Sequence, residues 1–276
     1  MTAGMFLFSG VDTMGKFLTD TLHPVQITWS RQIGLVLGVL FLLIRLGPGL
    51  MRSAHVGLQI SRGVLAAFSA VVFIYAVSFI PLADAVAISF VAPFIVTLLG
   101  ALVLREYVGP RRWIAIIIGF LGTLIIIRPG LGVLHPAAFA VIAAATAFAM
   151  RQVVSRMVAG ADPTRTTVAY TAIVSFALLT LPLPWVWQSP TSFEITLLAA
   201  MAVMAALAEV FVIMALDAAE AVVVAPMQYS LMIWGTMYGF LVFGQLPDIW
   251  TWVGALIIVA TGLYMLNRER IAARRG

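Results

Sequence analysis

Cysteine is absent from this sequence and charge is scarce. None of the 276 residues is cysteine, 10% are Asp, Glu, Lys or Arg, and 63% are hydrophobic. Soluble globular proteins are about 45–50% apolar and about 25% charged, so a single water-soluble core could not bury so many apolar side chains. The composition excludes a soluble enzyme, a disordered tail and a disulfide-stapled secreted module. We therefore expect an integral membrane protein.

The usual patterns for metals, phosphates and catalytic triads are also missing. His23, His55 and His135 fall in or beside different loops and no cysteine accompanies them, so we expect no metal and no cofactor. No Gly-x-x-x-x-Gly-Lys-[Ser/Thr] loop occurs, which argues against direct use of ATP. No Ser/His/Asp or His-Glu-x-x-His pattern occurs, and we predict that the protein is not an enzyme. An intramembrane enzyme using Asp12, Glu209 and the serines is the alternative from another class.

Long apolar stretches recur along the whole chain. A helix that crosses the hydrocarbon core needs about 20 residues, because about 30 Å is covered at about 1.5 Å per residue. Ten stretches approximate this length: Thr2–Thr19, Pro24–Ile44, Val56–Ile80, Ala83–Leu104, Arg112–Ile127, Pro136–Val158, Thr166–Trp187, Phe193–Leu216, Ala221–Phe243 and Ile249–Leu266. The first and the fifth fit the requirement least well. The sequence therefore predicts an all-α membrane protein with ten transmembrane helices and no sizeable extramembrane domain.

The positive charges alternate between loops. Eleven arginines follow even-numbered spans or lie in the tail: Arg45, Arg52, Arg105, Arg111, Arg112, Arg156, Arg165, Arg268, Arg270, Arg274 and Arg275. Only Arg128 follows an odd-numbered span. Loops rich in Lys and Arg stay in the cytoplasm, so both termini are predicted to be cytoplasmic, in a multi-pass protein of a bacterial-type inner membrane. The net charge of +5 reflects these loops, and no basic block in a soluble domain indicates a nucleic-acid partner.

The fourth and ninth spans match in layout. Each is a long apolar helix followed by a short polar link and a helix led by tryptophan, at Trp113 and Trp252. Five spans per half is an odd number, so the second half would be inverted relative to the first. Inverted repeats are typical of secondary transporters, which bind substrate where the halves meet. We therefore expect a first repeat at residues 1–130, a second at residues 131–276, and a central cavity between them.

One stretch, from Arg62 to Trp113, resembles the first repeat of EamA-type transporters of the drug/metabolite transporter superfamily. The matching residues are Arg62-Gly63, Tyr75, the turn from Pro81 to Ala85, Pro93 and Glu106. The second repeat is similar through Ala225-Pro226, Tyr229 and Trp234-Gly235, but it has Gln245 where the family usually has glutamate. The resemblance implies a 5+5 inverted repeat of ten helices and a cavity lined chiefly by spans three, four, eight and nine. Within the family, we expect an amino-acid exporter similar to YddG.

Six ionisable residues lie within the expected spans, where each costs about 2.5–3.5 kcal/mol at the bilayer centre. They are Asp12, Lys16, Arg31, Arg62, Arg151 and Glu209. By position along the spans, Arg62, Arg151 and Glu209 form an inner layer, and Asp12, Lys16 and Arg31 form an outer layer. The two layers could close alternately as gates, or their carboxylates could couple proton movement to transport. In the alternative interpretation the two inner arginines snorkel to the headgroups while Asp12 and Lys16 neutralise each other.

Polar and aromatic side chains between the two layers are candidates for lining the cavity. They are Tyr75, Ser78, Ser89, Gln228, Tyr229, Trp234 and Tyr238. Hydroxyls, amides and aromatic faces suit a zwitterion with an apolar side chain, and a cation could rest on the same rings. Such residues also commonly bond neighbouring helices without touching a ligand. Pro93 and Pro226 are candidate helix hinges, with a fixed bend as the alternative.

Together these features predict a carrier of small organic solutes that works by alternating access. Amino-acid export is favoured, and export of multiple drugs or cationic compounds is the alternative. A channel is a third possibility. The expected partners are the solute and membrane lipid. Gly34-x-x-x-Gly38 and Gly235-x-x-x-Gly239 permit close helix contact and are expected to serve internal packing, so a monomer is favoured and a dimer stays open.

Overall fold

The computed structural model describes residues 1–105, 109–128, 135–218 and 225–273, and every regular element in these ranges is a helix. The elements are α1 (Thr2–Leu18), α2 (Pro24–Leu46), η1 (Pro48–Met51), α3 (Val56–Val77), α4 (Leu82–Ser89), α5 (Ala92–Val103), α6 (Pro110–Ile127), α7 (Ala137–Val158), α8 (Thr164–Thr180), α9 (Leu183–Val186), α10 (Ser192–Ala218), η2 (Ala225–Tyr229), α12 (Ser230–Phe243) and α13 (Ile249–Ala273). The prediction of an all-helical protein is confirmed for the described residues.

Helical structure lies at each of the ten expected spans. Seven of the described helical segments are long and apolar enough to cross a membrane, and the expected fifth span, now α6, is among them. The other three positions hold α1, α8 and α12, which have 17, 17 and 14 residues. These are shorter than the roughly 20 residues that a perpendicular crossing requires. Seven spans are therefore supported by length and composition, and the total of ten stays a prediction.

Two of the expected spans are interrupted where the sequence has proline. The fourth span consists of α4 and α5, and Pro93 is the second residue of α5. A proline in the first turn needs no intrahelical partner for its missing N–H, so the chain breaks before Pro93 instead of kinking within one helix. In the ninth span Pro226 lies in the short 3-10 helix η2, which leads into α12. Residues 221–224 of that expected span lie outside the described residues.

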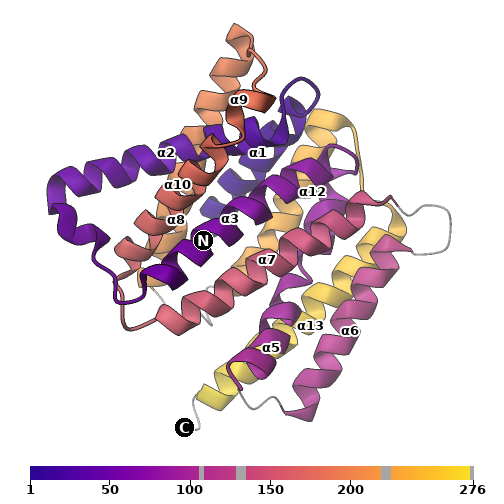
Figure 1. The fold of residues 1–276 in the computed structure, drawn as a ribbon. Helices are drawn as coiled ribbons and strands as arrows, with labels where there is room; N and C mark the ends of the chain where they lie inside the picture. Colours follow the sequence, from indigo (N-terminus) through magenta and orange to yellow (C-terminus); the bar gives the residue numbers. More distant parts are fainter. Residues whose placement is uncertain (106–108, 129–134, 219–224, 274–276) are drawn as a thin grey trace.

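The helices pack side by side as one bundle (Figure 1). α1 contacts α10 and α12, and buried residues occur all along it. α3 packs on α7 and α8, while α6 and α13 lie side by side at one edge. Close helix contact depends on glycine at Gly34, where a Cβ would come within 2.1 Å of the Ala202 carbonyl oxygen on α10. The expectation that the Gly34-x-x-x-Gly38 motif serves internal packing is confirmed at Gly34, whereas nothing lies within 4 Å of the Cβ position of Gly38.

A carboxylate ties together two loops at one end of the bundle. Asp162, between α7 and α8, accepts hydrogen bonds from Ser53 Oγ at 2.5 Å, the Ala54 backbone N–H at 2.9 Å and Gln59 Nε2 at 2.7 Å. The bond from Ser53, followed by those from Gln59 and Ala54, lowers the pKa of Asp162 below its ordinary value of 3.8. The loop before α3 is thus held to the loop before α8.

This contact makes a pH-dependent contribution to stability. Because the folded-state pKa of Asp162 is depressed, its contribution is complete above about pH 4 and is lost as the pH falls through the folded-state pKa. In melting curves of purified protein, we expect Asp162→Asn to lower the Tm at neutral pH and to have progressively less effect below about pH 4. Asp20→Asn, at an exposed carboxylate, is the control. An equal Tm difference between wild type and Asp162→Asn at pH 7 and pH 3 would contradict the assignment.

Candidate functional site

An ion pair lies in the interior of the bundle, between α1 and α2. Arg31 Nη1 is 3.5 Å from Asp12 Oδ1, and the Arg31 guanidinium lies 5.5 Å from the centre of the Phe8 ring. Asp12 is only 8% exposed. A buried carboxylate needs a partner because its desolvation costs several kcal/mol, and Arg31 supplies the opposite charge. In one interpretation of the sequence Asp12 and Lys16 neutralise each other; the structure instead pairs Asp12 with Arg31.

Arg62 is held by hydrogen bonds within the protein. Its Nε donates to Ser155 Oγ at 2.9 Å, and its Nη1 donates to Gln59 Oε1 at 3.3 Å, Thr171 Oγ1 at 3.2 Å and the Thr167 carbonyl at 3.3 Å. These contacts join α3 to α7 and α8. Arg62 is 8% exposed, so it does not snorkel to a headgroup. That alternative interpretation is wrong for Arg62.

Electrostatic interactions link charged side chains of the expected inner layer with one of the outer layer. Glu209 on α10 attracts both Arg62 and Arg151, and Arg31 and Arg151 repel each other. The Arg151 guanidinium lies 4.8 Å from the centre of the Phe148 ring, a cation–π contact. These charges on α1, α2, α3, α7 and α10 are called the charged network below; among the described residues, Asp12–Arg31 is its one ion pair shorter than 4 Å.

Lys16, near the C-terminal end of α1, binds the C-terminal end of α3. Its Nζ donates to the backbone carbonyls of Val77 at 2.6 Å and Ile80 at 2.5 Å, where α3 ends. It also attracts Asp84 in the first turn of α4, which accepts a hydrogen bond from Thr251 Oγ1 at 2.9 Å. A cation at a helix C-terminus is favourable because the terminal carbonyls carry partial negative charge. Lys16 thereby fixes α1 to the junction of α3 and α4.

Several buried polar atoms have no hydrogen-bond partner within the described part of the chain. Five of these atoms lie on four helices of the bundle: Ser9 Oγ, Gln32 Oε1, Arg151 Nε, Trp234 Nε1 and Thr236 Oγ1. Buried polar groups are normally hydrogen-bonded, so such a group indicates strain, an ordered water or a ligand. Ser9 lies on α1, and α2 and α12 both contact α1. Four of the five atoms therefore lie on α1 or on a helix that contacts it.

Aromatic rings lie on the α12 side of α1. Phe6 and Trp234 meet edge-to-face with centroids 5.2 Å apart, and Phe6 and Tyr238 are 5.4 Å apart. The Tyr238 hydroxyl lies 3.4 Å from where a Cβ would be on Gly10. Ser9 Oγ is likewise 3.8 Å from the Cβ position of Gly235. Glycines on both helices thus bring the rings and hydroxyls of α1 and α12 together.

For the other expected cavity residues, lining a cavity stays a prediction. Tyr75 and Ser78 are exposed, and the Ser78 hydroxyl donates to the Tyr75 carbonyl of its own helix at 2.7 Å. The Ser89 hydroxyl likewise donates to the Val86 carbonyl at 2.7 Å, and Gln228 is exposed.

Tyr229 packs on Phe90 at 5.1 Å and against Gly262 of α13. Among the seven expected lining residues, Trp234 and Tyr238 pack against α1, the helix that carries Asp12. Glu106, which contributed to the family resemblance, lies outside the described residues.

Sequence reasoning missed Phe6, Ser9, Gln32 and Thr236. Ser9, Asp12 and Lys16 are spaced as one helix face, which would have pointed to Ser9. Gln32 follows Arg31 directly, and Thr236 interrupts an apolar helix. No group of His, Cys, Asp or Glu that could hold a metal occurs within the described residues.

The chain is similar to known membrane transporters over most of its length. The EamA-like transporter family model matches residues 1–128. The S-adenosylmethionine uptake transporter of Rickettsia prowazekii is 25% identical over 94% of this chain and 88% of its own. The pseudopaline exporter CntI of Pseudomonas aeruginosa is 31% identical over 96% of this chain and 94% of its own. A crystal structure that shares 16% identity superposes with a TM-score of 0.65 over 98% of both chains.

These similarities and the apolar helices agree on a multi-pass membrane protein that transports small metabolites, and its bacterial relatives indicate the inner membrane. The relatives do not single out amino-acid exporters, since one is named for uptake of S-adenosylmethionine and the other for export of pseudopaline. The chain belongs to the EamA-like transporter family, within the drug/metabolite transporter superfamily.

Proposed function

We propose that this protein is a secondary carrier that binds its solute beside the Asp12–Arg31 pair, among α1, α2, α7 and α12. The observation that carries this proposal is the set of buried polar atoms without a partner in the described residues on these four helices. In a bilayer such atoms are costly, so they are retained where a ligand uses them. Membrane carriers commonly place their substrate site in such an interior position.

The favoured substrate is a zwitterion with an amino-acid group. Arg151 Nε and Trp234 Nε1 are donors that suit a carboxylate, and Gln32 Oε1 is an acceptor that suits an ammonium group. The rings of Phe6, Trp234 and Tyr238 offer apolar faces for the rest of the molecule. The relative named for S-adenosylmethionine handles a compound with a methionine part, which supports this class.

A cationic solute is the second candidate. Asp12 is a carboxylate on α1, aromatic rings of α12 pack against the same helix, and aromatic faces attract cations. The two classes differ in whether a carboxylate on the solute is required. Relatives named for uptake and for export both match, so the direction is expected to follow the solute gradients.

Alternating access between two inverted five-helix halves is the proposed mechanism. Matching the helices in order across the halves pairs α1 with α7, α2 with α8, α3 with α10, α5 with α12 and α6 with α13. Under this matching the α1–α10 contact corresponds to the α7–α3 contact, and the α2–α10 contact corresponds to the α8–α3 contact. The α1–α12 contact likewise corresponds to the α7–α5 contact. The contacts α2–α8 and α6–α13 each join two matched helices. A twofold relation between residues 1–130 and 131–276 would produce this pairing, which supports the proposal.

The charged network is proposed to couple the substrate site to the two gates. Lys16 would hold the end of α1 closed, while Arg62, Arg151 and Glu209 would hold the other end. The helix breaks at Pro93 and Pro226 would serve as hinges, because backbone bonds are already interrupted there. Both chain termini are proposed to be cytoplasmic, on the positive-inside argument.

Counterflow in liposomes tests the function. Purified protein reconstituted in vesicles preloaded with a candidate solute is expected to accumulate the labelled solute transiently and saturably, which a channel cannot do. A panel of amino acids, their carboxamides, nucleosides and organic cations then identifies the class. Inhibition by amino acids but not by their carboxamides supports a zwitterion. Equal inhibition by carboxamides would favour the cation, and a chemically altered product would indicate an enzyme.

A further inference from the structure

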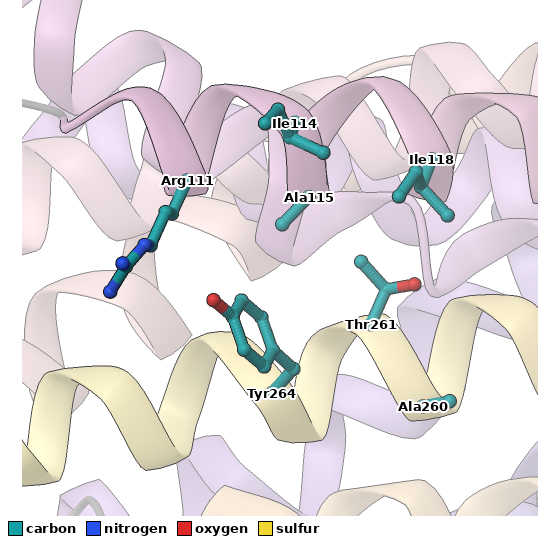
Figure 2. A pocket seen from close by; sticks show the side chains of 7 residues that line it. All are labelled: Arg111, Ile114, Ala115, Ile118, Ala260, Thr261 and Tyr264. Carbon is teal, nitrogen blue, oxygen red and sulfur yellow. The ribbon is translucent and has the colours of Figure 1, made fainter.

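A groove lies between α6 and α13, away from the charged network. Its volume is about 380 Å³, and Figure 2 shows Arg111 at one end, Ile114 and Ile118 along α6, and Tyr264 on α13. Ala115 and Ala260 lie on the two facing sides.

The groove follows from the way that the two helices pack. They pack closely at Gly122 and Gly254, where a Cβ on Gly254 would be 2.6 Å from the Gly122 carbonyl oxygen. Toward the start of α6 the facing residues include Ala115 and Ala260, whose small side chains leave space between the helices. Ile114 is 56% exposed and Tyr264 is 44% exposed, so the walls of the groove are apolar and open to the surroundings of the bundle.

The charge is confined to one end of the groove. Arg111 is exposed at the second position of α6, followed directly by Arg112. Figure 2 shows the Arg111 side chain reaching toward the tyrosine of α13, whose hydroxyl points to the same end. An elongated apolar slot with a guanidinium at its mouth matches a molecule with one acyl chain along the slot and an anionic head at the membrane surface.

We propose that this groove is a binding site for an anionic phospholipid, whose phosphate contacts Arg111 and whose acyl chain lies along Ile114, Ile118 and Ala260. The site is independent of the transported solute. A second copy of the chain fits the groove less well. A twofold dimer formed through this face, with its axis along the membrane normal, would bring the two Arg111 residues to the same depth near one another, and like charges oppose such an interface.

Native mass spectrometry of the full-length protein tests the site. The probes are phosphatidylglycerol and phosphatidylcholine with identical acyl chains, titrated into delipidated protein. We expect phosphatidylglycerol to bind about tenfold more tightly, and Arg111→Gln to remove this preference, the change expected when one charge-assisted hydrogen bond is lost. Arg45→Gln, at an exposed arginine of α2, is the matched control and should keep the preference.

A second variant tests the acyl-chain slot separately. Ala260→Phe fills the groove from an exposed position, and Leu256→Phe, one turn earlier and 71% exposed, does not. Only Ala260→Phe should weaken the binding of phosphatidylglycerol. Equal binding of the two lipids to wild type, or unchanged lipid binding in both Arg111→Gln and Ala260→Phe, would overturn the proposal. So would a wild-type dimer that Ala260→Phe converts to monomer with no change in lipid binding, since the groove would then be an interface between copies.

Discussion

Gly34→Ala is expected to destabilise the protein, whereas the same change at Gly38 should not. A Cβ on Gly34 would lie 2.1 Å from the carbonyl oxygen of Ala202, and 2.8 Å from its carbonyl carbon. Backbone atoms cannot rotate away as a flexible side chain can, so α2 and α10 would have to separate. Overpacking of this kind typically costs about 1–3 kcal/mol. Thermal unfolding of detergent-purified variants, followed by the loss of monodisperse protein on size exclusion, measures the difference.

Gly38 is the matched control within the same Gly-x-x-x-Gly motif. Nothing lies within 4 Å of the position that its Cβ would take. Alanine should therefore leave stability unchanged or raise it by roughly 0.5–1 kcal/mol, because glycine is unfavourable within a helix. If both alanine variants melt together with wild type, α2 and α10 do not approach as closely as described. If both are strongly destabilised, the motif contacts another surface through Gly38.

Removing one partner of the Asp12–Arg31 pair is expected to have the second large effect. The pair is mostly buried, with side-chain exposures of 12% for Asp12 and 21% for Arg31. Breaking a buried pair leaves an uncompensated charge and costs about 3–5 kcal/mol. Asp12→Asn and Arg31→Gln should each lower the Tm clearly and abolish transport. Asp20→Asn, an exposed carboxylate just beyond the end of α1, should do neither.

The double variant separates a structural role from a functional one. Replacing both charges by amides of similar size removes the burial penalty as well as the attraction, so the Asp12→Asn/Arg31→Gln protein should recover most of the lost stability. Counterflow by this double variant should remain absent, because the site has lost the charges that the solute contacts. A double variant that regains both stability and transport would show that the pair only supports packing, and the proposed substrate site would then be wrong.

Composition and hydropathy were sufficient to predict the class of fold. The low charge and the long apolar stretches predicted a helical membrane protein, and described helical structure occurs at all ten expected positions. Boundaries were less predictable where helices end within the bundle. The expected single helix before Leu104 divides at Pro93, because a proline can begin a helix as readily as bend one, and only the packing around it decides between the two.

The candidate site was predictable in part. Placing a charged side chain within a membrane is energetically costly. This cost alone identified the following charged residues as candidates for a functional or structural role: Asp12, Arg31, Arg62, Arg151 and Glu209.

Partners could not be predicted, since the i, i+4 spacing of Asp12 and Lys16 suggested a pair within one helix, whereas each of them reaches another helix. Sequence gives the face of each helix but not the neighbour that it meets. The role of Tyr75 and Ser78 as lining residues stays a prediction, and both are exposed in the structure.

The contact between Lys16 and the carbonyls of Val77 and Ile80 also gives the protein a built-in reporter. Lys16 is the sole lysine in the sequence. Amine-specific reagents therefore have one side-chain target, and that target is occupied by two acceptors whenever α1 is docked on the end of α3. The rate at which such a reagent modifies Lys16 in intact vesicles would follow undocking directly, without an engineered label.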